Sequence, residues 1–333
     1  MKLLSLVAIV AVVSYTPLSQ AAENPKAPYL SLKLEIEHAI SKGNAYLKSS
    51  QDNEGFWRNP QIPAYTALAL TAARRSPRLD EANAPHVKKG YQWLLSTQQN
   101  DGGIYVKGLA TYNTSTSLTA LAASGEPKYN FSILKARRFL INLQQDWDFK
   151  GESDNVNDGG IGYGGSYPHS DMSNTYLAIE ALKLTQSLAR DSEVRQSSLN
   201  WDAAIDFISR CQNLEQTNDQ KGISNDGSFV YFPGNSKAGT QVDKEGRETL
   251  RGYGSMSYAG LLSFIYADLK ENDPRVLAVT QWLRNNYTLE ENPGLGQQGL
   301  YYYYHVMSKA LTATNIDYLE AANGKRYDWR TEL

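Results

Sequence analysis

The sequence predicts an all-α protein built from five helical hairpins and an incomplete sixth. The first observation is a repeat, because the stretch from Lys42 to Trp57 recurs from Lys89 to Tyr105 with the same spacing of Gln and Gly, and three weaker copies follow. In each copy an amphipathic stretch precedes the Gln-to-Gly turn, and a stretch of small residues follows it. Repeats of this size stack supersecondary units that cannot bury their apolar faces alone.

The register position of the repeat falls at residues 51, 98, 144, 212 and 287, with separations of 47, 46, 68 and 75 residues. The position is a glutamine in four copies and Tyr287 in the fifth, and insertions delay the glycines of the third and fourth copies. We interpret these glutamines, and the tryptophan of the first copy, as structural residues that tie a helix end to the next turn through hydrogen bonds to backbone groups. They are Gln51, Trp57, Gln98 and Gln144.

The stretch before the first turn has apolar or small residues at three- and four-residue steps, which is the period of a helix. After the five turns come runs rich in Ala, Gly, Ser and Thr, at 66–70, 116–121, 175–179, 258–262 and 307–311. Helices with so little side-chain bulk can approach their neighbours closely, so we place them in an inner layer. Asp273 before Pro274, and Ala84 before Pro85, mark the starts of two outer helices.

The N-terminus has the pattern of a secretory signal peptide. Met1 and Lys2 precede an apolar run from Leu3 to Val13, and Ser19 to Ala21 offers a small-residue cleavage site. The run is much shorter than the ~20 residues of a membrane span. We therefore expect a signal peptide over residues 1–21 and an exported mature chain, periplasmic or secreted, that forms a single domain over residues 22–333 without a transmembrane span.

The amino-acid composition limits the classes of partner that we expect this protein to bind. The net charge is −2 with basic and acidic residues interspersed, which argues against nucleic acid. The single cysteine, Cys211, cannot form an intrachain disulfide. Tyrosine is unusually frequent, with 22 residues against eight phenylalanines, and each tyrosine combines an apolar face with a hydroxyl that needs a partner.

The first copy reads Lys-Gly, two residues, Tyr-Leu, three residues, Gln51, three residues, Gly55, one residue, Trp57. This pattern resembles the QW repeat of the terpene cyclase (squalene–hopene cyclase) and prenyltransferase β-subunit superfamily, and the tyrosines at 301–304 resemble its secreted bacterial members. The resemblance covers about residues 35–313. It implies an (α/α)6-type toroid with a ligand cavity where the inner helices converge and, if the protein is an enzyme, isomerase or transferase chemistry.

Cyclases of this superfamily carry Asp-x-Asp-Asp-Thr where this chain has Asp171 to Thr175, and the resemblance assigns the proton donor to the middle aspartate. That position is Ser173 here, and Asn174 replaces the next aspartate. A serine hydroxyl is too weak an acid to protonate an alkene or epoxide. Asp171 therefore stays the candidate catalytic acid, and the alternative is that it caps its helix N-terminus.

The zinc site that prenyltransferase β-subunits would use is not expected, and we predict no cofactor. His305 lies near the position of their histidine, but Ser255 and Ser257 stand where an Asp-x-Cys pair would be. One histidine without a cysteine is too few ligands for zinc. No Gly-x-Ser-x-Gly elbow is present, and a carboxylate pair of the glycosidase kind cannot be read from the spacing.

Tyrosines cluster in or just before the expected inner helices, where the superfamily holds carbocation-stabilising rings. Such rings attract cations and stack on apolar or sugar surfaces; the alternative is that they fill the core. The candidate ligand-binding residues are Tyr65, Tyr112, Tyr176, Tyr258, Tyr303 and His305, with Tyr253 and Tyr304 also in inner-helix positions.

Three functions follow as expectations. The first is a squalene cyclase-like protein with a degenerate acid motif that binds an isoprenoid or another hydrophobic or amphipathic ligand. The second is a secreted polysaccharide-active enzyme or carbohydrate-binding protein on an α/α toroid, and the third is a structural interaction module. Because residues 323–333 predict a turn and only the opening of another outer helix, we also expect an open ring edge. We expect self-association to close it, and the alternative is closure by a C-terminal portion missing from this sequence.

Overall fold

The computed structural model describes residues 30–145, 155–164, 169–191, 198–243, 245–321 and 324–333. The chain divides into two compact units, residues 1–41 and 42–333. The first is described only from Leu30, as the beginning of α1 (Leu30–Ser50), and the architecture below is that of the second. The signal peptide expected at residues 1–21 lies outside the described residues. Among the described helices none is long and apolar enough to cross a membrane.

The described residues are mostly helical, which confirms the all-α prediction for secondary structure, and their strands form two separate pairs with no closed sheet. The remaining elements are α2 (Pro63–Arg74), α3 (Leu79–Ala82), α4 (Pro85–Ser96), α5 (Ala110–Ser124), the 3₁₀ helix η1 (Pro127–Tyr129), α6 (Asn130–Ile141), α7 (Met172–Leu184), α8 (Gln186–Asp191), α9 (Trp201–Arg210), β1 (Thr240–Val242), β2 (Glu248–Leu250), α10 (Gly254–Tyr266), α11 (Pro274–Asn285), α12 (Leu300–Ala313), β3 (Leu319–Glu320), β4 (Arg326–Tyr327) and α13 (Trp329–Glu332).

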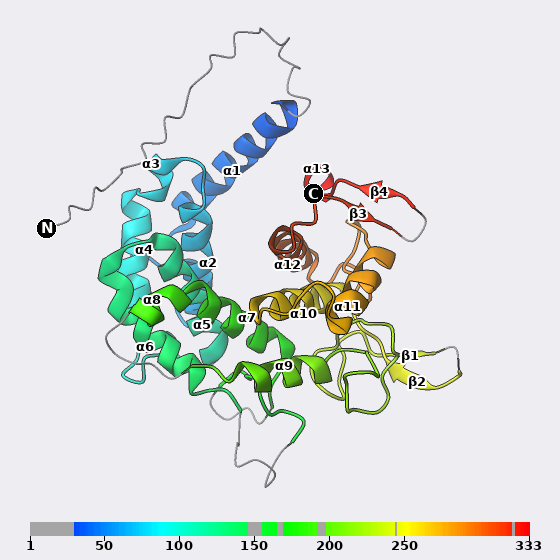
Figure 1. Cartoon of the computed structure of the whole chain (residues 1–333). Coiled ribbons are helices and arrows are strands. Elements are labelled where there is room, and N and C mark those ends of the chain that lie inside the picture. Colours follow the sequence, from blue (N-terminus) through cyan, green and yellow to red (C-terminus); the bar gives the residue numbers. More distant parts are fainter. Residues whose placement is uncertain (1–29, 146–154, 165–168, 192–197, 244, 322–323) are drawn as a thin grey trace, which may run out of the picture. The chain divides into compact units, whose positions relative to one another are not determined.

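Five helices rich in small residues form a central row in sequence order. Helix α2 packs against α5, α5 against α7, α7 against α10, and α10 against α12 (Figure 1). Gly260 of α10 shows how closely the fourth turn approaches this row, because a Cβ added there would lie 2.5 Å from the Phe229 ring. Outer helices cover the row: α4 packs on α2, α6 on α5, and both α9 and α11 on α10.

The turns at the four register glutamines share one hydrogen-bonding scheme. Each side-chain amide donates to a glycine carbonyl of its own turn and to a carbonyl at the start of the next outer helix. These bonds are Gln51 to Gly55 (2.8 Å) and His86 (2.9 Å), Gln98 to Gly102 (3.0 Å) and Ser132 (3.0 Å), Gln144 to Gly159 (3.0 Å) and Asn200 (2.8 Å), and Gln212 to Gly227 (3.2 Å) and Arg275 (2.8 Å).

Trp57 joins the first turn to the second outer helix. Its side chain is buried, and its indole N–H donates to the Leu47 carbonyl at 2.7 Å. A Cβ added at Gly90 of α4 would lie 2.8 Å from the Trp57 ring, so a glycine is needed where α4 crosses it. The residue thus packs at a junction between neighbouring outer helices.

Two of the central helices, α2 and α10, are capped by residues of neighbouring elements. Asn113 of α5 accepts a hydrogen bond from the Ala64 N–H of α2 at 3.0 Å, and Asn292 accepts one from the Ser255 N–H of α10 at 2.9 Å. Orphan N–H groups at a helix start need such partners when they are buried. The caps therefore fix the register between successive central helices.

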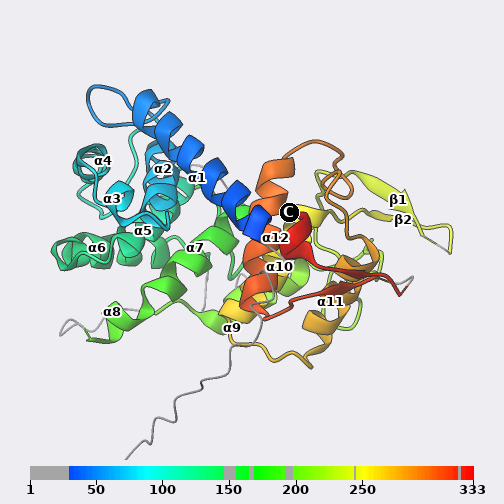
Figure 2. The same cartoon turned by 90° about the horizontal axis from the view of Figure 1, so that it is seen from above.

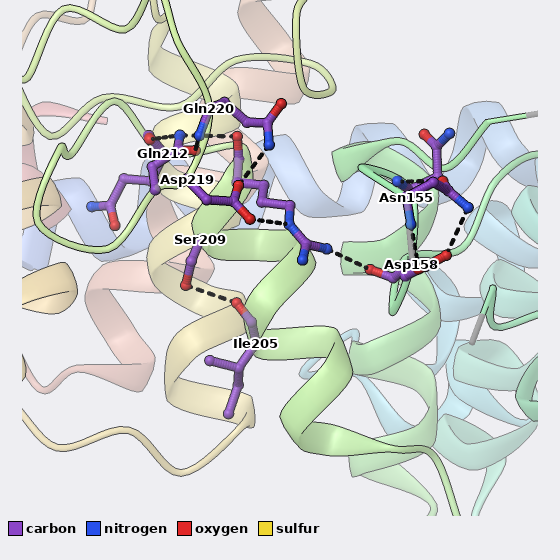
Figure 3. Close-up of polar contacts among 10 residues, drawn as sticks. Asn155, Asp158, Ile205, Ser209, Gln212, Asp219 and Gln220 are labelled. Carbon is purple, nitrogen blue, oxygen red and sulfur yellow. Dashed lines mark hydrogen bonds and ion pairs between the residues drawn. The ribbon is translucent and has the colours of Figure 1, made fainter. Parts of the chain in front are cut away.

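The two insertions form structure that the repeat did not predict. The fourth turn carries the antiparallel pair β1–β2, in which Gln241 pairs with Thr249 and which projects from the helices in Figure 2. Arg210 links the insertions, since its guanidinium binds the Asp219 carboxylate at 3.2 Å and the Asp158 carbonyl at 3.4 Å (Figure 3).

The C-terminal segment differs in part from the expected turn and outer-helix start. Residues 319–327 contain the hairpin β3–β4, and only the four residues of α13 are helical. The indole of Trp329 is buried and donates to the Ile316 carbonyl at 2.7 Å. Tyr287 occupies the fifth register position, but its hydroxyl donates to Glu332 at 3.0 Å, while Asn292 and Gly296 form the bridge that closes this turn.

Candidate functional site

Asp171 neighbours Tyr231, Tyr253 and Tyr302, and Tyr163 adjoins Tyr231 and Tyr253. We call Tyr163, Tyr231, Tyr253 and Tyr302 the tyrosine cluster. The hydroxyls of Tyr163 and Tyr231 are 2.8 Å apart. Burial raises the pKa of Tyr231, and the neighbouring Asp171 and Tyr163 raise it further. Burial likewise raises the pKa of Tyr253, and the neighbouring Tyr302 and Asp171 raise it further.

Asp171 is fully buried and caps α7. One carboxyl oxygen accepts the Asn174 backbone N–H at 2.9 Å, and the other accepts the Asn174 side-chain amide at 2.7 Å. Burial raises the pKa of this carboxyl, while hydrogen bonds from Asn174 and Tyr231 and the charge of Lys237 oppose the rise. The group is therefore both a helix cap and the negative end of the tyrosine cluster.

Like Tyr302, Tyr253 has a buried hydroxyl in the cluster that is left without a partner among the described residues. The residue is 2% exposed, and its hydroxyl has no hydrogen-bond partner among the described residues. A buried hydroxyl without a partner costs about 1–3 kcal/mol. The neighbours of this unpartnered hydroxyl include Tyr302 and Asp171.

Tyr65 and Tyr112, two of the tyrosines predicted to bind a ligand, extend the cluster towards α2. Burial raises the pKa of Tyr112, and neighbouring Tyr65 and Tyr163 add to this effect. The guanidinium of Arg58 lies 5.1 Å from the centre of the Tyr65 ring. Both predicted residues are partly buried, so part of each side chain can be reached from solvent.

Tyr176 and His305 lie in a second polar group, the Glu180 cluster, with Glu180 and Lys309. Lys309 forms an ion pair with the buried Glu180 and donates to the Tyr176 hydroxyl at 3.0 Å. A cavity of about 330 Å³ adjoins this pair and is also lined by Arg75. Burial lowers the pKa of His305, and the charge of Lys309 lowers it further.

Tyr258 and Tyr303, the other predicted ligand residues, pack within the interface of α10 and α12. Their ring centres are 5.6 Å apart, and both side chains are buried. The Tyr303 hydroxyl donates to the Thr288 carbonyl at 2.9 Å. These two residues are not brought together with Tyr65 and Tyr112, and their contacts are those of core residues.

The site residues predicted from the sequence did not include Tyr163, Tyr231, Tyr302 or Lys237. A signal for the first two exists, because each lies two residues after the apolar bridge residue of its turn, Ile161 in the third copy and Phe229 in the fourth. Tyr302 lies one turn before Val306 in a run of four tyrosines, where side-chain direction cannot be read from composition.

The described residues contain no group of three or more His, Cys, Asp or Glu side chains arranged to hold a metal ion. No protein-family model matches the chain, and no curated protein is significantly similar to it.

Proposed function

We propose that this chain is an exported repeat protein, similar to squalene cyclases and prenyltransferase β-subunits, that binds an isoprenoid or another hydrophobic or amphipathic ligand beside the tyrosine cluster. The observation that carries the proposal is the buried Tyr253 hydroxyl, which has no partner among the described residues and lies among three other tyrosines and a buried carboxyl. A ligand hydroxyl or carbonyl would supply that partner.

An amphipathic ligand suits this combination of groups. Tyrosine rings offer apolar faces, and their hydroxyls and the Asp171 carboxyl offer a few placed polar contacts. Ligand sites commonly combine a mostly apolar wall with few convergent polar groups. The apolar body of the ligand would lie along the rings, with its polar end at Tyr253.

The packing order of the helices supports the toroid that the resemblance implies. Successive central helices pack side by side, and outer helices cover them, as stacked hairpins would require. Helices α2 and α12 stand at the two ends of this row. We propose that the open edge formed by these ends is closed by self-association.

Acid-initiated cyclisation is not part of the proposal. Ser173 stands in the place of the family's proton donor and lies beside Tyr302. Both carboxyl oxygens of Asp171 already accept hydrogen bonds from Asn174. We expect no hopene-type product from squalene. Restoring the motif by Ser173→Asp with Asn174→Asp tests whether the loss of these two aspartates alone prevents cyclisation. Product formed by the unmodified protein and lost on Asp171→Asn would contradict the expectation.

The carbohydrate-processing alternative is less well supported. A glycosidase pair requires carboxyl groups about 5–9.5 Å apart. Asp171 and Glu180 are the buried carboxylates of the two clusters, and nine residues along α7 at about 1.5 Å each separate their Cα atoms by roughly 13 Å. Glu180 is moreover engaged by Lys309. The Cα separation and the ion pair of Glu180 therefore do not favour these two acids as a glycosidase pair.

Calorimetric titration with farnesol, an uncharged isoprenoid alcohol, tests the proposal. We expect saturable binding that Tyr253→Phe weakens roughly two- to tenfold, the equivalent of one neutral hydrogen bond of about 0.5–1.5 kcal/mol. Tyr301→Phe is the matched control, because Tyr301 is 85% exposed and lies outside the cluster. Absence of farnesol binding, or equal weakening by both variants, would contradict the proposal.

A further inference from the structure

Lys237 places a cation on the tyrosine cluster. Its ammonium lies 3.7 Å from the centre of the Tyr231 ring. This is closer than the lysine–tyrosine contacts of Lys325 with Tyr327 (4.3 Å), Lys128 with Tyr129 (5.0 Å) and Lys309 with Tyr176 (5.5 Å). A cation over a tyrosine face is attracted by the negative centre of the ring, by about 0.5–1 kcal/mol at an exposed site and more where water is excluded.

A buried carboxyl lies next to Tyr231. Tyr231 is 6% exposed and neighbours the fully buried Asp171, whose charge acts on Lys237. Among the described residues, the ammonium itself forms no hydrogen bond or ion pair, and its close contact is with the Tyr231 ring. Lys237 is thus held by the ring face and by the field of Asp171, without a direct bond.

The lysine is also easy to displace. It is exposed, and it lies in a loop whose backbone is fixed independently of it, since Ser236 accepts the Ala238 N–H at 3.1 Å and Arg251 donates to the Gly239 carbonyl at 3.0 Å. A lysine side chain has four rotatable bonds and can swing into water while this loop stays in place. Only the aromatic contact and the attraction of Asp171 would be lost.

We infer that Tyr231 and Asp171 form a recognition site for an organic ammonium group, which a ligand reaches by displacing the ammonium of Lys237. The inference rests on the proposed function, because it assigns a positively charged head group to the amphipathic ligand of the tyrosine cluster. Aromatic faces beside a carboxylate are the arrangement that recognises alkylated ammonium ions. Lys237 then acts as a built-in competitor that favours ligands binding more strongly than a lysine side chain does.

Calorimetric titration with choline tests the inference, with 3,3-dimethylbutan-1-ol as an uncharged probe of nearly the same shape. We expect Lys237→Met to bind choline at least tenfold more tightly than the wild-type chain, and to bind the uncharged probe at least tenfold more weakly than choline. Lys325→Met removes a lysine–tyrosine contact in the β3–β4 hairpin and should leave choline affinity unchanged.

Two further variants in the Lys237→Met background identify the groups. Tyr231→Phe keeps the ring and should retain choline affinity within threefold, whereas Asp171→Asn should weaken it at least fivefold. Choline affinity that does not rise in Lys237→Met, or equal binding of the uncharged probe, would overturn the inference. Farnesol titration of the same proteins separates the proposals: farnesol binding without choline binding rejects only the ammonium site, and loss of both rejects the ligand site itself.

Discussion

The side chain of Gln144 provides the sharpest test of how the turns hold the helices together. Its amide N–H donates to Gly159 and Asn200, and its carbonyl accepts the Asn200 N–H at 2.9 Å. The Gln144→Ala variant loses these three bonds. At about 1 kcal/mol for each net hydrogen bond, the free energy of unfolding should fall by about 3 kcal/mol.

Gln145→Ala is the matched control. Gln145 is the next residue, and its backbone N–H donates to the Gly160 carbonyl at 2.8 Å, a bond that alanine preserves. The free energy of unfolding, measured by urea denaturation with circular dichroism at 222 nm, should change by no more than about 0.5 kcal/mol in this variant. Gln98→Ala loses two hydrogen bonds, so its decrease in the free energy of unfolding should lie between those of Gln144→Ala and Gln145→Ala. If Gln144→Ala and Gln145→Ala were equally stable, the glutamine bonds would not be what joins successive hairpins.

Three further predictions concern stability. Trp57→Ala should lower the free energy of unfolding by about 3–5 kcal/mol in urea denaturation, because a large buried side chain at a helix junction is lost; an unchanged melting temperature would contradict its packing role. Lys309→Met should cost about 3–5 kcal/mol by leaving Glu180 buried without its cation, and adding Glu180→Gln should recover part of the loss, which a double-mutant cycle measures. Because the pKa of Asp171 is raised in the folded state, its favourable contribution to stability is complete below the unfolded pKa of about 4 and is lost as pH rises through the folded pKa. In melting curves from pH 4 to pH 8, Asp171→Asn should therefore gain stability relative to the wild-type chain as pH rises. A stability difference that stays constant with pH would show that this carboxyl does not titrate abnormally.

The local parts of the structure could be predicted from the sequence. The small residues after each turn became central helices, and Asp273 before Pro274 caps α11 by accepting the Arg275 N–H at 2.9 Å. Such signals are readable because capping depends on residues a few positions apart. The cap at Asp171 was open to prediction for the same reason.

The candidate site could be predicted only in part, because its contacts join distant residues. Glu180 and Lys309 meet across 129 positions, and nothing in either local sequence marks the other as its partner. Lys237 lies in an insertion whose path the repeat does not determine, although it contacts Tyr231 only six positions earlier. Composition indicated that tyrosines matter, but only packing separates Tyr253, in the cluster, from Tyr258 and Tyr303, in the core.

Mass spectrometry of the native protein tests the central claim most directly, since it identifies whatever small molecule co-purifies with the chain. We predict a hydrophobic or amphipathic molecule at a stoichiometry near one per chain, released on denaturation and reduced in amount by Tyr253→Phe but not by Tyr301→Phe. An oligosaccharide in its place, or an isoprenoid retained equally by both variants, would contradict the assignment of the tyrosine cluster as an amphipathic ligand site.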